Sequence, residues 1–149
     1  MLSTIIAMLL CFSPSVFSND EFSCEVSHAL YHDSFTIKAS YRFILTNGNG
    51  ILLVNGKVSD RKKHYIISRE IRFVYSRETI SDYLFTSDYI RKNPLDNVPN
   101  ELLLSHYPSF FVKVGHSLVF HIERENKKDF IMSFVSVPFF YCNGSKSNN

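Results

Sequence analysis

The chain has 149 residues and a formal net charge of +2, with 16 Lys and Arg residues set against 14 Asp and Glu residues. This balance excludes a strongly basic protein, so we expect no nucleic-acid partner, and the length predicts a single domain. With 45% hydrophobic residues, 15% aromatic residues and few Gly and Pro, the composition excludes a disordered chain and predicts a sizeable core.

The N-terminus is predicted to be an export signal. The apolar run Ile5–Phe12 has the length of a signal-peptide core, Pro14 breaks it, and small to medium residues precede a cleavage position after Ser18. Residues 1–18 are therefore interpreted as a signal peptide. The alternative is an N-terminal membrane anchor, if the true start lies further upstream, and it would give membrane association. Because Ile5–Phe12 is too short to span a bilayer comfortably, cleavage is preferred.

Two cysteines, Cys24 and Cys142, remain near the two ends of the mature chain. An even number of cysteines in an exported protein predicts a disulfide between them, with two free thiols as the alternative. A metal site is disfavoured, since neither cysteine has a second one nearby. Residues 19–142 are expected to form a single β-rich envelope domain, and residues 143–149 a disordered tail.

Five strand-like segments fill the first two thirds of this domain: Cys24–Leu30, Ser34–Thr46, Ile51–Ser59, His64–Arg77 and Tyr83–Arg91. The second is the clearest, because apolar and polar residues alternate along it. Asn47–Gly50 predicts a hairpin turn, and Gly56 suggests a β-bulge. Arg69 interrupts the apolar face of the fourth segment, so it either lies at a rim or pairs with a carboxylate such as that of Glu70.

Lys92–Pro108 is the one stretch of the mature chain that predicts a helix. Its prolines are incompatible with a strand. We expect a short helix over Pro99–His106, with Leu102 or Leu103 buried against the sheet and Pro108 ending it.

The pattern of strands resumes after this stretch. Phe110–Val114 suggests a short extended piece, followed by strands over His116–Glu125 and Phe130–Val137. Pro138 is expected to break strand pairing. About seven strands with short connections predict a mainly β protein, a curled antiparallel sheet or partly closed barrel with one short helix over an open end or edge. An immunoglobulin-like sandwich is the alternative, but it lacks the buried Trp and the cysteine spacing of that fold.

No motif carries enzyme chemistry. Nucleophile elbows, phosphate-binding loops, zinc-helix motifs and paired-carboxylate signatures are all lacking. His28 and His32 flank a strand end, and His116 and His121 fall on opposite faces of a strand. We therefore expect no catalytic residue, no cofactor and no metal site, and interpret the protein as not an enzyme. Histidines that sense pH are a less favoured interpretation than scattered surface histidines.

Six segments, in this order, resemble the FidL-like family of small enterobacterial envelope proteins: Phe22–Glu25, Asn47–Gly50, Tyr65–Arg69, Asp96–Pro99, Phe110–Lys113 and Pro138–Cys142. The resemblance covers nearly all of the mature chain. It implies a protein in the periplasm, or one that faces the periplasm from the inner membrane of a Gram-negative bacterium.

More distantly, the chain is similar to the periplasmic partners in ToxR/ToxS-type and PsaE/PsaF-type pairs. In those pairs a small envelope protein stabilises or tunes a membrane-spanning winged-helix regulator. The resemblance therefore implies a non-enzymatic accessory protein that binds the periplasmic domain of a single-span regulator at an exposed sheet edge or aromatic rim.

The alternative is a stand-alone periplasmic binding module, which takes an apolar ligand or inhibits an envelope enzyme. A continuous apolar cavity would favour an apolar ligand, whereas a barrel filled by side chains would count against it.

Overall fold

A computed structural model describes residues 22–126, 129–134 and 137–143, with only the backbone described for 137–139. The predicted signal peptide or anchor, residues 1–18, and residues 144–149 of the predicted tail lie outside these ranges. Within them, no helix is long and apolar enough to cross a membrane.

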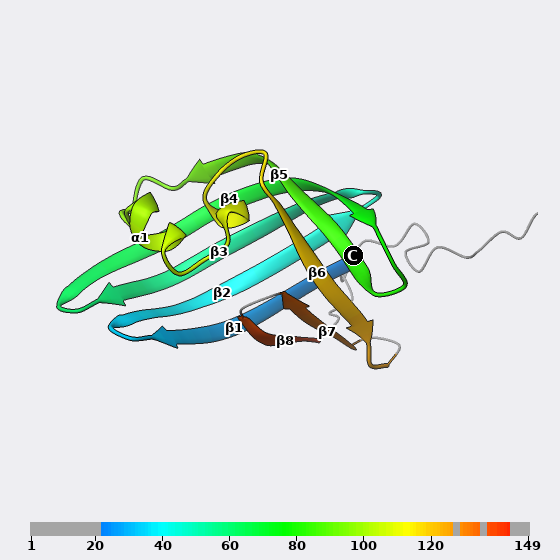
Figure 1. Ribbon diagram of the computed structural model, residues 1–149, viewed down its shortest axis with the longest axis horizontal. Helices are drawn as coiled ribbons and strands as arrows, with labels where there is room; N and C mark the ends of the chain where they lie inside the picture. The colour runs from blue at the N-terminus through cyan, green and yellow to red at the C-terminus, as the bar shows by residue number, and fades with distance from the viewer. Residues whose placement is uncertain (1–21, 127–128, 135–136, 144–149) are drawn as a thin grey trace, which may run out of the picture.

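Eight strands form one antiparallel sheet in the order of the chain. They are β1 (Phe22–His32), β2 (Phe35–Thr46), β3 (Asn49–Asp60), β4 (Lys63–Arg77), β5 (Asp82–Lys92), β6 (Ser117–Arg124), β7 (Asp129–Phe134) and β8 (Val137–Asn143). Figure 1 shows the long strands β1–β5 as one curved sheet, while β6–β8 turn back across one end towards β1. The sheet is thus nearly closed into a barrel, as the sequence predicts.

The predicted disulfide lies at the seam of this barrel. Cys24 of β1 and Cys142 of β8 are bonded, with their Cα atoms 5.4 Å apart and 118 residues between them in sequence. Both side chains are fully buried. The bond therefore joins the first and last strands of the sheet.

The strand count of seven is wrong because β8 is a full strand. Pro138 was expected to break pairing, yet the ladder with β7 continues on both sides of it, from Phe134 opposite Val137 to Asp129 opposite Asn143. Proline is tolerated at a sheet edge, where a missing N–H removes no ladder bond, and β8 is the last strand in the order. Asn143 accordingly belongs to β8 and not to the tail.

The alternation predicted for the second segment is confirmed, because every odd-numbered residue of β2 is buried. The predicted hairpin is present, with positive φ angles at Asn47 (48°) and Gly48 (81°). Gly56 marks no bulge: it pairs in regular register with Ala39, and a Cβ atom there would lie 2.2 Å from the Lys38 carbonyl oxygen. The lack of a side chain at Gly56 therefore allows β2 and β3 to pack closely.

Two short helices pack on the inner face of the sheet, α1 (Asn100–Leu104) and η1 (Ser109–Phe111) (Figure 1). Helix α1 confirms the predicted helix and buries Leu103, but it ends before His106, where the N–H groups of residues 106 and 107 both donate to the Leu103 carbonyl. The expected extended piece over Phe110–Val114 is wrong. Phe110 and Phe111 are both buried, and a strand would send them to opposite faces, whereas the 3-10 turn buries both.

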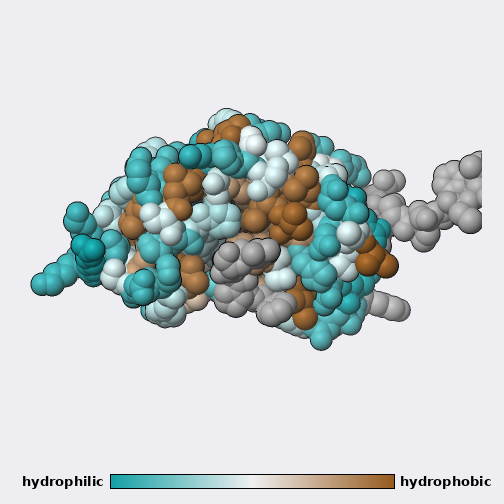
Figure 2. All heavy atoms as spheres, viewed as in Figure 1, coloured by the Kyte–Doolittle hydropathy of each residue, from teal (hydrophilic) through white to brown (hydrophobic). Residues whose placement is uncertain are grey.

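Aromatic side chains dominate the core. The largest fully buried side chains include Tyr41, Phe35, Phe43, Phe73, Phe85, Phe110, Phe120 and Phe140. On the face shown in Figure 2, apolar residues gather near the centre, and hydrophilic residues surround them towards both ends.

Candidate functional site

A buried ion pair attaches the loop before α1 to the sheet. Arg69 lies on the inward face of β4 and is 3% exposed. Its Nε donates to Asp96 Oδ2 at 2.8 Å, and its Nη2 donates to Asp96 Oδ1 at 3.3 Å. Nη2 also lies within hydrogen-bond distance of the Val98 carbonyl and Asn100 Oδ1. The Nε and Nη2 groups of Arg69 thus bind the loop and the first residue of α1.

The sequence predicts Arg69 either at a rim or paired with a carboxylate such as that of Glu70. The rim position is wrong, and the carboxylate that pairs with Arg69 is that of Asp96. Glu70 lies on the opposite face of β4 and forms ion pairs with Arg72 and Arg91. Successive residues of a strand point to opposite faces, so Glu70 was never placed to reach its neighbour.

The Asp96 carboxylate is held ionised by its surroundings. It accepts hydrogen bonds from the backbone N–H groups of Ser68 (3.0 Å) and Val98 (3.3 Å), and Lys92 Nζ lies 3.5 Å away. Burial raises the pKa of Asp96. The hydrogen bonds from Arg69 and Ser68 outweigh that effect, with the charges of Arg69 and Lys92, and the pKa falls below its ordinary value.

A second contact attaches the end of this segment to β2. The hydroxyl oxygens of Tyr41 and Tyr107 are 2.7 Å apart in the core. Burial raises the pKa of Tyr107 to about 12, although the hydrogen bond with Tyr41 opposes the increase. Burial and then the Tyr107 neighbour also raise the pKa of Tyr41. Both tyrosines are therefore neutral hydrogen-bonding groups at physiological pH.

Two histidines meet beside this contact. The His106 ring stacks on Phe35, with ring centroids 4.0 Å apart, and its Nδ1 lies 2.8 Å from His32 Nδ1. One ring must donate and the other accept, so at least one ring nitrogen of the pair is unprotonated. Burial, followed by the charge of His32, lowers the pKa of His106. This contact links the end of the α1 segment to the β1–β2 hairpin.

The cavity between the sheet and the helices is too small for a ligand. It is bordered by Tyr41, Arg69, Leu103 and Phe111 and holds about 10 Å³. That volume is about the space of one water molecule. An apolar ligand in this cavity would therefore have to displace core side chains.

The remaining histidines do not form a metal site. His121 Nδ1 lies 2.8 Å from Asp82 and its Nε2 lies 2.9 Å from Glu123, and these hydrogen bonds raise its pKa. His28 packs edge-on against Phe140, and burial lowers its pKa. Among the described residues, no group of three or more His, Cys, Asp and Glu side chains is placed to hold a metal ion.

The second half of β5 is an open sheet edge. Residues Asp82–Thr86 pair with β6, and the ladder then ends. Ser87 still bonds to the backbone of Gly115 and His116. On that side of Asp88–Lys92, no strand of the described chain pairs. We call this segment the β5 edge.

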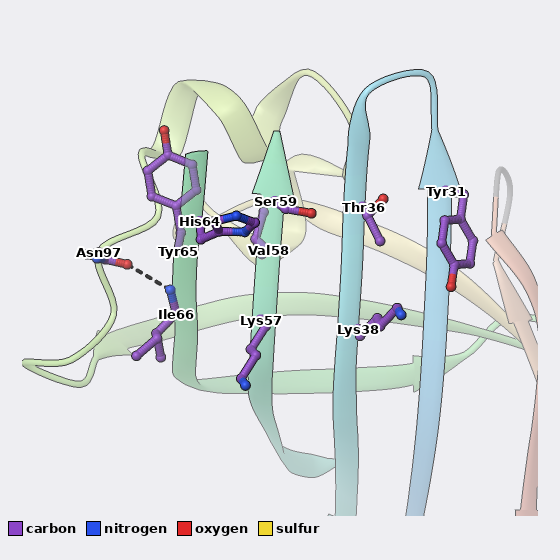
Figure 3. Close-up of a pocket in the computed structure, with 10 residues that line it drawn as sticks. All are labelled: Tyr31, Thr36, Lys38, Lys57, Val58, Ser59, His64, Tyr65, Ile66 and Asn97. Carbon is purple, nitrogen blue, oxygen red and sulfur yellow. Dashed lines mark hydrogen bonds between the residues drawn. The ribbon is translucent and has the colours of Figure 1, made fainter. Parts of the chain in front are cut away.

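A groove lies on the outer face of β1–β4 and has a volume of about 730 Å³ (Figure 3). Its lining crosses four adjacent strands and includes Tyr31, Lys38, Lys57, His64, Ile66 and Asn97. Asn97 comes from the loop before α1, and its Oδ1 accepts a hydrogen bond from the Ile66 N–H at 2.7 Å. We call this hollow the outer groove.

Sequence reasoning missed both the Asp96 anchor and the outer groove. Asp96 and Arg69 are 27 residues apart, and no local pattern connects them. The sequence does contain a pattern that predicts part of the outer groove. The two-residue turn at Asn47–Gly48 fixes the register of β2 and β3, and counting back from it places Lys38 directly opposite Lys57.

Comparison with known proteins gives a family. A search of curated proteins finds no relative that matches the chain. The family model described as the YqeJ C-terminal domain matches residues 21–142, which include both helices and the described strands up to the last residue but one of β8. The matched residues make up most of the 149-residue sequence. The chain therefore belongs to the YqeJ C-terminal domain family.

Proposed function

We propose that this chain is an exported, non-enzymatic accessory protein, similar to FidL-like proteins, that binds the periplasmic domain of a membrane-spanning winged-helix regulator and stabilises or tunes it. The observation that carries the proposal is the β5 edge, where a long strand of the barrel lacks a neighbour over residues Asp88–Lys92. Unpaired backbone groups at such an edge form a template for a strand of another protein.

The β5 edge carries an irregularity at its start, where the register with β4 shifts between Arg72 and Phe73 and leaves the exposed Asp88 unpaired, but the rest of the edge is less protected. Natural edges are often blocked by outward-pointing lysines and other charged side chains. Here Arg91 is tied to Glu70, and Lys92 donates to the Val98 carbonyl and lies near Asp96. These two cations are therefore held by partners within the domain.

Two further features support the proposal. A buried disulfide between Cys24 and Cys142 is typical of proteins in an oxidising compartment such as the periplasm. The cavity between the sheet and the helices holds only about 10 Å³, which speaks against an apolar ligand at that place. Binding energy, and not chemistry, is then what the domain supplies.

The direction of backbone groups gives a sharp test at Ile90. The Asn93 N–H donates to the Ser68 carbonyl of β4 at 2.9 Å. Because N–H groups alternate in direction along a strand, those of Arg91 and Tyr89 also point to β4, and that of Ile90 points to the open edge. Ile90→Pro removes this edge donor. Ile90→Ala is the matched control, because it shortens the half-buried side chain and keeps the N–H group.

The experiment deletes the gene and measures, by immunoblot and transcript level, a membrane-spanning winged-helix regulator encoded beside it and its target. We expect loss of regulator on deletion, rescue by the wild type and Ile90→Ala, and no rescue by Ile90→Pro. Variants are compared only after periplasmic extracts show equal amounts of protein. Unchanged regulator after deletion, the lack of such a regulator, or equal rescue by both variants would contradict the proposal.

A further inference from the structure

The outer groove has an excess of positive charge that nothing in its lining balances. Lys38 and Lys57 line it together with His64, and no Asp or Glu does. The chain as a whole has nearly equal numbers of acidic and basic residues, so this absence is a local property. Two acidic residues adjoin lining residues in sequence. Asp60 accepts a hydrogen bond from Ser34 at 2.8 Å, and Asp96 is paired with Arg69 on the inner face of the sheet.

The two lysines repel each other. Lys38 of β2 and Lys57 of β3 are direct cross-strand partners, and like charges placed opposite each other destabilise a sheet. Among the described residues, neither ammonium group forms an ion pair. The one contact of Lys38 Nζ is with the face of the Tyr31 ring, 5.8 Å from its centroid. An anion placed between the two lysines would remove this repulsion.

The sides of the groove are apolar. Tyr31 is 65% exposed on the β1 side, and Ile66 is 44% exposed on the β4 side. Figure 3 shows the two lysines between these side chains. Asn97 uses its Oδ1 to accept from Ile66, which leaves its amide NH₂ group as a donor at the same end. The volume of about 730 Å³ lies in the range of small-molecule sites.

We propose that the outer groove binds a small organic anion. The carboxylate or phosphate group lies between Lys38 and Lys57, and an apolar body lies between Tyr31 and Ile66. Lysine suits this role because its ammonium group acts as a point charge and accepts either oxyanion geometry. The groove lies on β1–β4 and the β5 edge on another strand, so this site does not depend on the proposed protein partner.

The test is a titration of ¹⁵N-labelled protein, followed by amide chemical shifts. Benzoate and phenyl phosphate are the two anions, and benzamide is the neutral match for benzoate. We expect both anions to give saturable shifts around Lys57 and Ile66, with benzamide giving none. Added salt should weaken the binding, because exposed charges are screened. The relative affinity of the two anions identifies the preferred oxyanion.

The variants isolate the two lysines. Lys38→Gln with Lys57→Gln should weaken anion binding by about tenfold or more, since a charge-assisted hydrogen bond is lost at each position. Lys62→Gln with Lys63→Gln removes the same charge from the adjacent hairpin tip, outside the lining, and should change the affinity by less than about threefold. Retained amide dispersion shows that each variant is folded.

A readout of stability separates the site from a chance patch. Lys57→Gln alone should raise Tm at low salt by removing the repulsion, and either anion should raise the Tm of the wild type but not of the double variant. Saturable binding by benzamide, shifts that map elsewhere, equal losses in both double variants, or binding of an acidic peptide but of neither small anion would each overturn the proposal.

Discussion

Removing the Asp96 carboxylate is expected to cost more stability than any other single loss of charge in the described chain. In Asp96→Ala, the Arg69 guanidinium keeps its buried position and loses two of its hydrogen bonds, while the N–H groups of Ser68 and Val98 lose their acceptor. Breaking a buried ion pair from one side costs about 3–5 kcal/mol, because an uncompensated charge remains. For a domain of ordinary stability, that is about a third or more of the total free energy of unfolding.

Glu70→Ala is the matched control. Glu70 also pairs with arginines, but Arg72 and Arg91 have side chains that are 57% and 65% exposed, against 1% for Arg69. The Glu70 side chain itself is 12% exposed, but its partners reach solvent, and pairs with a solvent-exposed partner contribute about 1 kcal/mol or less.

The assay is urea unfolding at neutral pH, followed by circular dichroism, with the free energies extrapolated to water. A double variant, Arg69→Met with Asp96→Ala, should recover part of the loss, because no charge is then left buried. If Asp96→Ala and Glu70→Ala cost the same, or if Asp96→Ala costs less than about 1 kcal/mol, the ion pair does not anchor the loop as described.

Three further predictions concern the disulfide, α1 and pH. Cys24→Ser should lower stability by about 2–5 kcal/mol in urea unfolding, and mass spectrometry without reductant should find no free thiol at Cys24 or Cys142 in the wild type. Leu103→Asp, at a site 1% exposed, should cost about 3 kcal/mol or more, whereas Leu95→Asp, at a site 68% exposed, should change stability by about 0.5 kcal/mol or less in the same assay. The pKa of His106 is lowered in the fold, so its neutral form contributes stability that is present above the unfolded pKa of about 6.5 and is lost as the pH falls below that value. The free energy of unfolding of His106→Gln should therefore fall less between about pH 7 and 5 than that of the wild type. An unchanged pH profile would contradict this.

The strands could be predicted because their signal is local. In β2, burial alternates with sequence position, and a period of two needs only a dozen neighbouring residues to be seen. The same holds for the Asn47–Gly48 turn, whose residues tolerate positive φ. Helix α1 was predicted from its prolines and leucines, and its position against the sheet followed from Leu103.

What could not be predicted depends on contacts between distant segments or on context. Arg69 looked like an interruption of an apolar face, because its partner lies in a loop 27 residues away. Pro138 looked like a strand breaker, because only the completed sheet shows that β8 is an edge. Phe110 and Phe111 looked extended, because aromatic residues favour strands when nothing else is known. The candidate site was missed for a related reason, since the β5 edge exists only because β6 is shorter than its partner.

The position of the disulfide determines how the domain responds to a force on its two ends. Cys24 is two residues from the start of β1, and Cys142 is one residue from the end of β8, so the chain enters and leaves the domain at one point. In Figure 1 this point lies at the opposite end from α1 and the tips of the β1–β2 and β3–β4 hairpins. A force that pulls the two termini apart would be borne by the disulfide, and the backbone hydrogen bonds between the strands would not carry it. The hairpin tips at the far end of the domain would lie outside the path of that force.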